Sequence, residues 1–153
     1  MITLTDQAFD PADALRDFTA TSHGAGGIVS FSGHVRPQSG SGAVSALHLE
    51  SHPVMTERGI EDAAKQAGEQ WSLIATRIIH RVGTIATGEA IVFVATAATH
   101  RREAFLAADY LMDYLKTDAI FWKKETGLSG DVWIEPRQQD YTDRARWAHT
   151  GDT

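Results

Sequence analysis

The sequence predicts an α+β fold with a mixed, largely antiparallel sheet and two main helices, in a single domain spanning residues 1–153. Three observations predict it. A chain of 153 residues fits about one domain. Hydrophobic residues make up 42% and charged residues 22%, which is typical of an ordinary globular protein. Strand-like and helix-like segments follow one another irregularly, which favours α+β over a regular βαβ array.

The first half of the chain predicts three strands and two helices. Residues 2–4 alternate as in a weak strand, and Asp10-Pro11 opens a short helix, because Asp caps helices and Pro suits the first helical position. An apolar run at 28–31 predicts a strand, and alternation predicts another at 44–50. The Pro, Gly and Ser residues of 36–42 predict a mobile loop between these two strands. Helical spacing of apolar residues predicts a helix over 54–70.

The second half predicts two strands, a long helix and a hairpin. The strands cover 74–82 and 90–98 and are joined by a turn at 87–89. Thr99 or His100 caps a helix that ends near 116–117, and its predicted core residues are Ala104, Phe105, Ala108, Leu111, Met112 and Leu115.

The predicted hairpin pairs 120–125 with 132–135 through a turn at 127–131. Residues 136–153 form a polar C-terminal tail, in which Tyr141 and Trp147 are possible docking anchors.

Composition excludes several classes of function. A net charge of −6 disfavours nucleic-acid binding, and the absence of cysteine excludes thiolate nucleophiles and Cys-based metal sites within this chain. The N-terminus lacks the basic start and apolar run of a signal peptide. The longest apolar run, 90–98, is far below the ~20 residues that span a bilayer. We therefore expect a cytoplasmic protein that binds neither nucleic acid nor membranes.

Familiar catalytic motifs are missing. The sequence has no phosphate-binding P-loop, no GxGxxG, no GxSxG and no HExxH, which disfavours nucleotide hydrolysis and serine-hydrolase chemistry. His48, Glu50 and His52 alternate on one predicted strand and could form a zinc or iron site. The other interpretation, a polar and solvent-facing strand edge, is preferred, so we expect neither a metal nor a bound cofactor.

Cationic residues are the more informative set. His100 and Arg101 occupy a helix N-terminus, where free backbone N–H groups favour an anion. Lys123 lies beside Phe121 on a predicted strand, where partial burial lowers the pKa of a lysine and makes it a usable base or nucleophile. The cations of the predicted pocket are Arg36, His100, Arg101, Arg102, Lys116, Lys123 and Lys124.

If these cations converge, they suit a small phosphorylated or carboxylated ligand. Alternatively, they serve helix dipoles and solubility. Strand alternation predicts that Lys123 and Lys124 point to opposite faces. The roughly 16 residues from Arg101 to Lys116 span about 24 Å of helix. Either the cations at the two ends of this helix belong to two separate sites, or a second copy of the chain supplies the cations of one end.

The chain resembles the large, catalytic subunit of molybdopterin synthase, the MoaE family, over nearly its whole length. The matching stretches are Phe31-Ser32-Gly33-His34-Val35-Arg36, Leu49-Glu50, Met55-Thr56-Glu57, Ile79-His80-Arg81-Val82-Gly83, Gly88-Glu89, His100-Arg101, Met112-Asp113-Tyr114-Leu115-Lys116 and Phe121-Trp122-Lys123-Lys124-Glu125. Their order and spacing together make the resemblance specific.

The resemblance implies an α/β-hammerhead-like fold and a sulfurtransferase. The family converts cyclic pyranopterin monophosphate into the molybdopterin dithiolene, using sulfur carried as a C-terminal thiocarboxylate by a small ubiquitin-like partner subunit. It also implies a homodimer, and a heterotetramer once two small subunits dock. The alternative is a non-catalytic module that binds a ubiquitin-like tail or a phosphorylated metabolite.

The resemblance assigns roles to single residues. Lys116 and Lys123 match the family's essential lysines and are expected to be catalytic. The residues expected to bind substrate are His34, Val35, Arg36, His100, Arg101, Lys124 and Glu125, of which His100 and Arg101 reach the pocket from the other copy of the dimer.

Overall fold

The computed structural model describes residues 1–40, 42–128 and 130–149. Ser41 of the predicted loop, Ser129 of the predicted turn and residues 150–153 of the predicted tail lie outside this part of the chain. The helices are α1 (Pro11–Thr21), α2 (Met55–Gln70), α3 (Arg101–Thr117), α4 (Gln138–Ala145) and the 3-10 helix η1 (Arg146–His149). The strands are β1 (Ile2–Thr5), β2 (Gly27–His34), β3 (Gln38–Ser39), β4 (Gly42–Ser51), β5 (Ala75–Arg81), β6 (Gly83–Ala86), β7 (Ala90–Ala98), β8 (Phe121–Gly127) and β9 (Gly130–Ile134).

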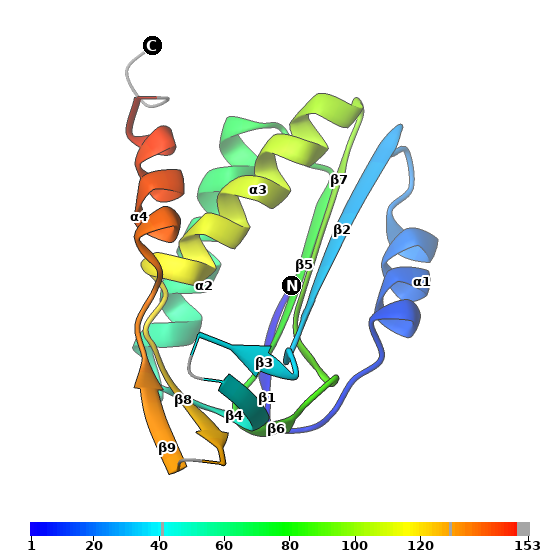
Figure 1. Ribbon diagram of the computed structural model, residues 1–153. Helices are drawn as coiled ribbons and strands as arrows, with labels where there is room; N and C mark the ends of the chain where they lie inside the picture. The colour runs from blue at the N-terminus through cyan, green and yellow to red at the C-terminus, as the bar shows by residue number, and fades with distance from the viewer. Residues whose placement is uncertain (41, 129, 150–153) are drawn as a thin grey trace.

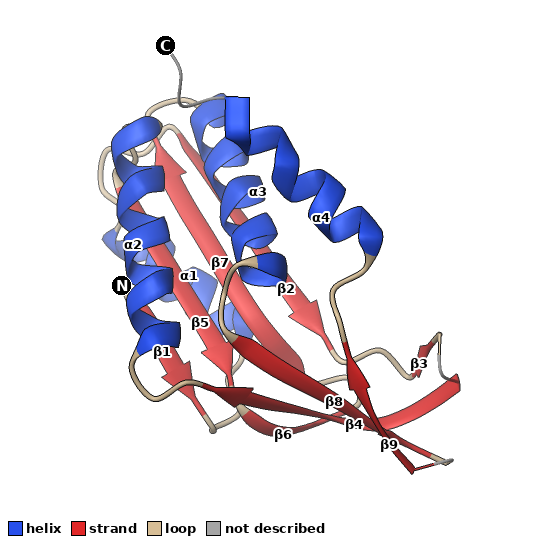
Figure 2. Ribbon diagram, turned by 90° about the vertical axis from the view of Figure 1, so that its left-hand side faces the viewer, coloured by secondary structure: helices blue, strands red, loops and turns tan. Residues whose placement is uncertain are grey.

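The first sheet has the strand order β1-β5-β7-β2. β1 runs parallel to β5, and the other neighbours are antiparallel. Helices α2 and α3 cover one face and α1 covers the other (Figures 1 and 2). The central strand β7 is buried almost throughout, which explains its continuous apolar sequence.

The second sheet crosses one end of the first (Figure 2). Its order is β3-β4-β8-β9, with β6 also paired to β4, and all its pairs are antiparallel. The buried cluster at this sheet consists of Val44, Leu49 and Ile85 from its strands and Val35 from the connection between β2 and β3. The predicted α+β class and largely antiparallel pairing are confirmed, but the strands form two sheets, because β4 pairs with β8 and β6 instead of joining β7.

Most predicted elements are present, and the local signals explain them. The Asp10 side chain accepts a hydrogen bond from the Ala12 N–H at 2.8 Å, as predicted for the cap of α1. His100 occupies the N-cap position of α3, but its side chain makes no capping hydrogen bond. Phe105 was wrongly placed in the core, since it is 61% exposed. Two elements were missed, β6 and α4, and β3 forms inside the predicted loop.

The C-terminal segment is anchored on α3. The buried carboxylate of Asp113 accepts hydrogen bonds from Arg146 Nη2 at 2.7 Å and from Trp147 Nε1 at 2.6 Å. The Trp147 ring packs edge-on against Trp71 and Tyr110, with centroids 5.6 Å apart in both pairs. Trp147 is therefore an anchor, as predicted, and it fixes α4 beside α3 (Figure 1). Among the described helices, none is both long enough and apolar enough to span a bilayer.

Candidate active site

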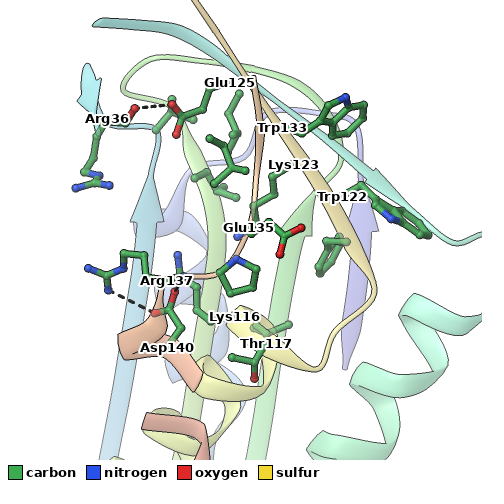
Figure 3. A pocket seen from close by; sticks show the side chains of 18 of the residues that line it. Arg36, Lys116, Thr117, Trp122, Lys123, Glu125, Trp133, Glu135, Arg137 and Asp140 are labelled. Atoms are coloured by element: carbon green, nitrogen blue, oxygen red, sulfur yellow. Dashed lines mark hydrogen bonds and ion pairs between the residues drawn. The ribbon is translucent and has the colours of Figure 1, made fainter. Parts of the chain in front are cut away.

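A cavity of about 490 Å³ lies between the second sheet, the C-terminal end of α3 and the start of α4 (Figure 3). Its apolar walls include Val44, Leu47 and Ile91, so charged groups inside it are partly screened from water. Six of the residues predicted for the site line this cavity: His34, Val35, Arg36, Lys116, Lys123 and Glu125.

The two predicted catalytic lysines point into this cavity from different elements (Figure 3). Lys116 lies in the last turn of α3, and Lys123 lies on β8, opposite the buried Leu49 of β4. Burial, followed by the charge of Lys116, lowers the pKa of Lys123 from 10.5 to about 8, while the Asp140 carboxylate acts in the opposite direction. Lys123 is therefore partly neutral near physiological pH, which a proton-transfer group requires.

Strand alternation separates the next two residues of β8. Glu125 faces the cavity, and its Oε2 accepts a hydrogen bond from Ser39 Oγ at 2.5 Å (Figure 3). Lys124 does not line the cavity; its Nζ lies 3.6 Å from Asp131 Oδ2 and 5.5 Å from the ring centroid of Trp133. The predicted opposite orientation of Lys123 and Lys124 is confirmed.

The rim of the cavity carries two large aromatic residues. Trp122 is 49% exposed and Trp133 is 58% exposed, and both line the opening. Such exposed aromatic side chains next to a cavity are typical of a surface that contacts another molecule.

Backbone hydrogen bonds position the segment that precedes Arg36. The Val35 N–H donates to the Glu89 carbonyl at 3.0 Å, and the Val35 carbonyl accepts from the Gly88 N–H at 2.8 Å. The His34 ring lies with Nδ1 3.3 Å from the Gly88 carbonyl oxygen. Arg36 follows this fixed pair and is itself exposed at the cavity edge.

His100 and Arg101 lie at the other end of α3 and do not line the cavity within this chain. Both are exposed. This placement agrees with the distance argument from helix length, which predicted either two sites or a second copy of the chain that supplies one end.

Sequence reasoning missed the wall that the C-terminal segment contributes. Glu135, Arg137, Asp140 and Tyr141 line the cavity close to Lys116. Arg137 Nη2 lies 3.4 Å from Asp140 Oδ1, and the Arg137 N–H donates to Asp140 Oδ2 at 2.9 Å (Figure 3). The Asp140 carboxylate thus accepts from both the backbone and the guanidinium of Arg137 at the start of α4, so an Asp three residues after the N-cap position is the local signal for this helix.

His80 received no role in the sequence analysis, and in the structure it packs behind Phe121, one of the residues that line the cavity. It is 4% exposed, and its ring stacks on Phe121 with centroids 4.2 Å apart. His80 Nδ1 donates to the Arg81 carbonyl at 2.8 Å. Burial, with a smaller contribution from the charges of Lys123 and Lys116, lowers the pKa of His80 from 6.5 to about 4, although the Arg81 hydrogen bond opposes this shift. The ring is therefore a neutral wall behind the two lysines.

The three side chains considered as metal ligands do not converge. His48 Nε2 lies 3.4 Å from Glu50 Oε1, whereas His52 turns toward α2 and its Nδ1 accepts from the N–H groups of Val54 and Met55. In the part of the chain that the structure describes, no three His, Asp or Glu side chains are grouped to hold a metal ion. His52 instead satisfies free N–H groups at the start of a helix.

The family model described as MoaE protein matches residues 4–118. The chain belongs to this family. It is 51% identical over 147 residues to the molybdopterin synthase catalytic subunit of Caulobacter vibrioides, covering 96% of this chain and 97% of the relative.

Solved structures agree with this assignment. A MoaE protein from Burkholderia ambifaria has a TM-score of 0.81 and 38% identity, and 97% of each chain is covered. A complex of subunits 1 and 2 of molybdopterin-converting factor from Helicobacter pylori, 16% identical, has the same fold, with a TM-score of 0.75 over 89% of this chain and 91% of that one. Membership of the MoaE family identifies the chain as an enzyme subunit of molybdenum cofactor biosynthesis. The predicted family, fold class and enzymatic function are confirmed.

Proposed function

We propose that this chain transfers sulfur from the C-terminal thiocarboxylate of a small ubiquitin-like subunit to cyclic pyranopterin monophosphate, and that Lys123 and Lys116 carry the chemistry. The observation that supports this most is the convergence of Lys123, Lys116 and Arg36 in one cavity of about 490 Å³. We place the reaction in the cytoplasm.

Lys123 is the proton-transfer group of this proposal. With a pKa of about 8, about one Lys123 side chain in ten is neutral at pH 7. The neutral amine accepts a proton and the ammonium donates one, so a single residue serves both halves of the reaction. In each transfer the thiocarboxylate sulfur forms a C–S bond to a side-chain carbon of the pterin while a C–O bond at that carbon breaks, and the oxygen leaves with the phosphate or, after protonation, as water. Water then hydrolyses the thioester, which leaves the sulfur on the product and a carboxylate on the tail.

Arg36 and Lys116 are the anion-binding groups. The substrate phosphate and the thiocarboxylate are both anionic, and the positive charges of Arg36 and Lys116, two exposed residues that line the cavity, attract and orient them. Lys116 lies beside the partner's tail, and Arg36, with His34 and Val35, holds the pterin. Glu125 also lines the cavity, and the proposal gives it a role in binding substrate. Lys124 shares that stretch of sequence but faces the hairpin surface, so a direct contact with substrate requires the hairpin to turn.

The chain has no cysteine, so another molecule must bring the sulfur, and in this proposal that molecule is the small subunit. The small subunit of the proposal is supported by the Helicobacter pylori structure of the same fold, which is a two-subunit complex. The exposed Trp122 and Trp133 at the cavity rim suit contact with such a partner.

A second copy of the chain completes the site in this proposal by supplying His100 and Arg101. Two features support an interface between copies. Strand β2 is at the edge of its sheet, and Phe31 on this strand and Phe105 near the start of α3 are both exposed. Unpaired strand edges with exposed aromatic residues favour pairing with another chain. The complete assembly is then a heterotetramer of two copies and two small subunits.

The test is product formation by the purified chain with cyclic pyranopterin monophosphate and a thiocarboxylated small subunit. Molybdopterin is detected as its fluorescent oxidised derivative. Lys123→Ala is expected to abolish turnover while leaving fold and dimer intact, and Lys65→Ala, an exposed lysine on α2, is the control with unchanged activity. Near-normal product from Lys123→Ala would refute the catalytic assignment. A stable complex with the partner but no product from the unsubstituted chain would favour the non-catalytic binding module.

A further inference from the structure

Two stretches of the family resemblance, 79–83 and 88–89, contain no residue that the proposed reaction uses, and they meet through an ion pair. Arg81, at the end of β5, donates from Nη1 to Glu89 Oε2 at 2.7 Å and from Nη2 to the Thr84 carbonyl at 3.4 Å. The Arg81 side chain is 6% exposed and that of Glu89 is 45% exposed. A buried guanidinium requires such partners, so the ion pair holds Glu89 at a fixed place against β5.

The Glu89 carboxylate also determines the shape of the turn between β6 and β7. Its Oε2 accepts a second hydrogen bond, from the Ala86 N–H at 3.2 Å, and the Glu89 N–H donates to the Ala86 carbonyl at 3.0 Å. Gly88, inside the turn, has φ of 88°, a conformation that favours glycine. The Arg81 hydrogen bond is also the main cause that lowers the pKa of Glu89, so the carboxylate stays ionised to a lower pH than an ordinary glutamate does.

This turn is bonded to both flanks of the segment that enters the cavity. On one flank, Val35 exchanges two backbone hydrogen bonds with Gly88 and Glu89, at 2.8 and 3.0 Å. On the other flank, Thr87 Oγ1 donates to the Val44 carbonyl at 2.7 Å. One turn therefore holds Val35, directly before Arg36, and Val44, near the start of β4.

We propose that Arg81 and Glu89 are positioning residues for Arg36, because they fix the turn that holds both flanks of the Arg36 segment. Neither side chain lines the cavity, so their effect on substrate passes through Val35 and Val44. The inference deepens the proposed function and rests on it, since Arg36 is the proposed ligand of the substrate anion.

Three substitutions at Glu89 test the proposal. Glu89→Ala removes the acceptor of both hydrogen bonds, Glu89→Asp withdraws it by one methylene, and Glu89→Gln keeps an oxygen acceptor in place. Glu61→Ala, an exposed glutamate on α2, is the matched control. Because Glu89 is half exposed, these variants are expected to fold. If Glu89→Ala does not fold, Glu89→Asp takes its place in the comparison.

The expected result is a higher KM for cyclic pyranopterin monophosphate with kcat within about twofold of the unsubstituted chain. Loss of one or two hydrogen bonds predicts a rise of roughly fivefold for Glu89→Ala, a smaller one for Glu89→Asp, and a return to nearly normal KM for Glu89→Gln. In an Arg36→Ala background, Glu89→Ala is expected to change KM by less than about twofold, because the residue it positions is gone. An unchanged KM, a fall in kcat alone, or an equal effect in the Arg36→Ala background would overturn the proposal.

Amide hydrogen exchange supplies a readout that does not depend on activity. Glu89→Ala is expected to speed exchange at the Val35 N–H about tenfold or more, and Glu89→Gln and Glu61→Ala are expected to leave it unchanged. If exchange responds but the unsubstituted chain makes no molybdopterin, the proposed function is wrong and the positioning stands. If the chain is active and Glu89→Ala changes neither KM nor exchange, the positioning is wrong and the function stands.

Discussion

Replacing Lys123 with Met is expected to stabilise the fold at pH 7 while it abolishes sulfur transfer. The folded protein holds a proton on Lys123 less readily than the unfolded chain does, since burial and Lys116 lower its pKa from 10.5 to about 8. At pH 7 both states are charged, and the difference corresponds to roughly 3 kcal/mol of lost stability. Met retains most of the length of the apolar stem without the charge, so Lys123→Met is expected to recover about 2–3 kcal/mol.

The stabilisation that Lys123→Met provides is expected to depend on pH, because the pKa of Lys123 is lower in the folded protein than in the unfolded chain. Between pH 8 and 10.5 the unfolded chain still binds the proton that the folded protein has released, so the stability of the unsubstituted protein rises with pH in this window. The advantage of Lys123→Met should therefore be largest at pH 7 and shrink toward zero near pH 10.5.

Urea unfolding at pH 7, 9 and 10.5 measures this difference, and taking the difference between variants cancels the titration of other groups. Lys65→Met, at an exposed position on α2, is the control and is expected to change the free energy of unfolding by less than about 0.5 kcal/mol. If Lys123→Met is less stable at pH 7, or equally stabilising at all three pH values, the buried charge is not the cause.

Three further substitutions test the packing around the site. His80→Phe keeps the ring stack on Phe121 but removes a group whose pKa is lowered from 6.5 to about 4. Relative to this variant, the free energy of unfolding of the unsubstituted protein should fall by about 2–3 kcal/mol between pH 6.5 and 4.5, as measured by urea unfolding. Parallel pH curves for the two proteins would contradict this. Asp113→Ala removes the shared acceptor of the Trp147 indole and its neighbouring arginine, and is expected to cost about 2–3 kcal/mol and to expose α4 to proteases; an unchanged cleavage pattern would show that α4 is held otherwise. Thr56→Val removes a buried hydroxyl that donates to the Ile120 carbonyl at 2.6 Å. The free energy of unfolding, measured in urea, is expected to fall by about 2 kcal/mol. An unchanged free energy would mean that water replaces the hydrogen bond.

The sequence predicts elements well where one local signal dominates. Asp10-Pro11 begins α1 and the apolar run of 90–98 forms the central strand, because capping and burial on both faces leave clear patterns. Phe105 follows the buried Ala104 by one position, and a step of one residue around a helix leaves its side chain at the margin, outside the packed stripe. Helix α4 is too polar to show an apolar stripe, and its anchors, Asp113 and Trp147, are far apart in sequence.

For the site as well, features set by the local backbone could be predicted from the sequence, and features set by tertiary packing could not. Strand alternation correctly separates Lys123 from Lys124, since it is a property of the backbone alone. The contribution of Arg137 and Asp140 requires the C-terminal segment to fold back over α3, and the neutral state of His80 requires knowledge of what covers it. Tertiary packing decides both, and no local pattern in the sequence encodes it.

The placement of the tryptophans gives the protein two built-in optical probes. The chain has four tryptophans. Trp71 and Trp147 form an edge-on pair inside the fold, so their emission should be blue-shifted and should change only when α4 detaches or the protein unfolds. Trp122 and Trp133 are half exposed at the rim of the cavity, so their emission should be red-shifted and sensitive to quenchers until another molecule covers them. A single unlabelled fluorescence spectrum therefore separates folding from occupancy of the cavity.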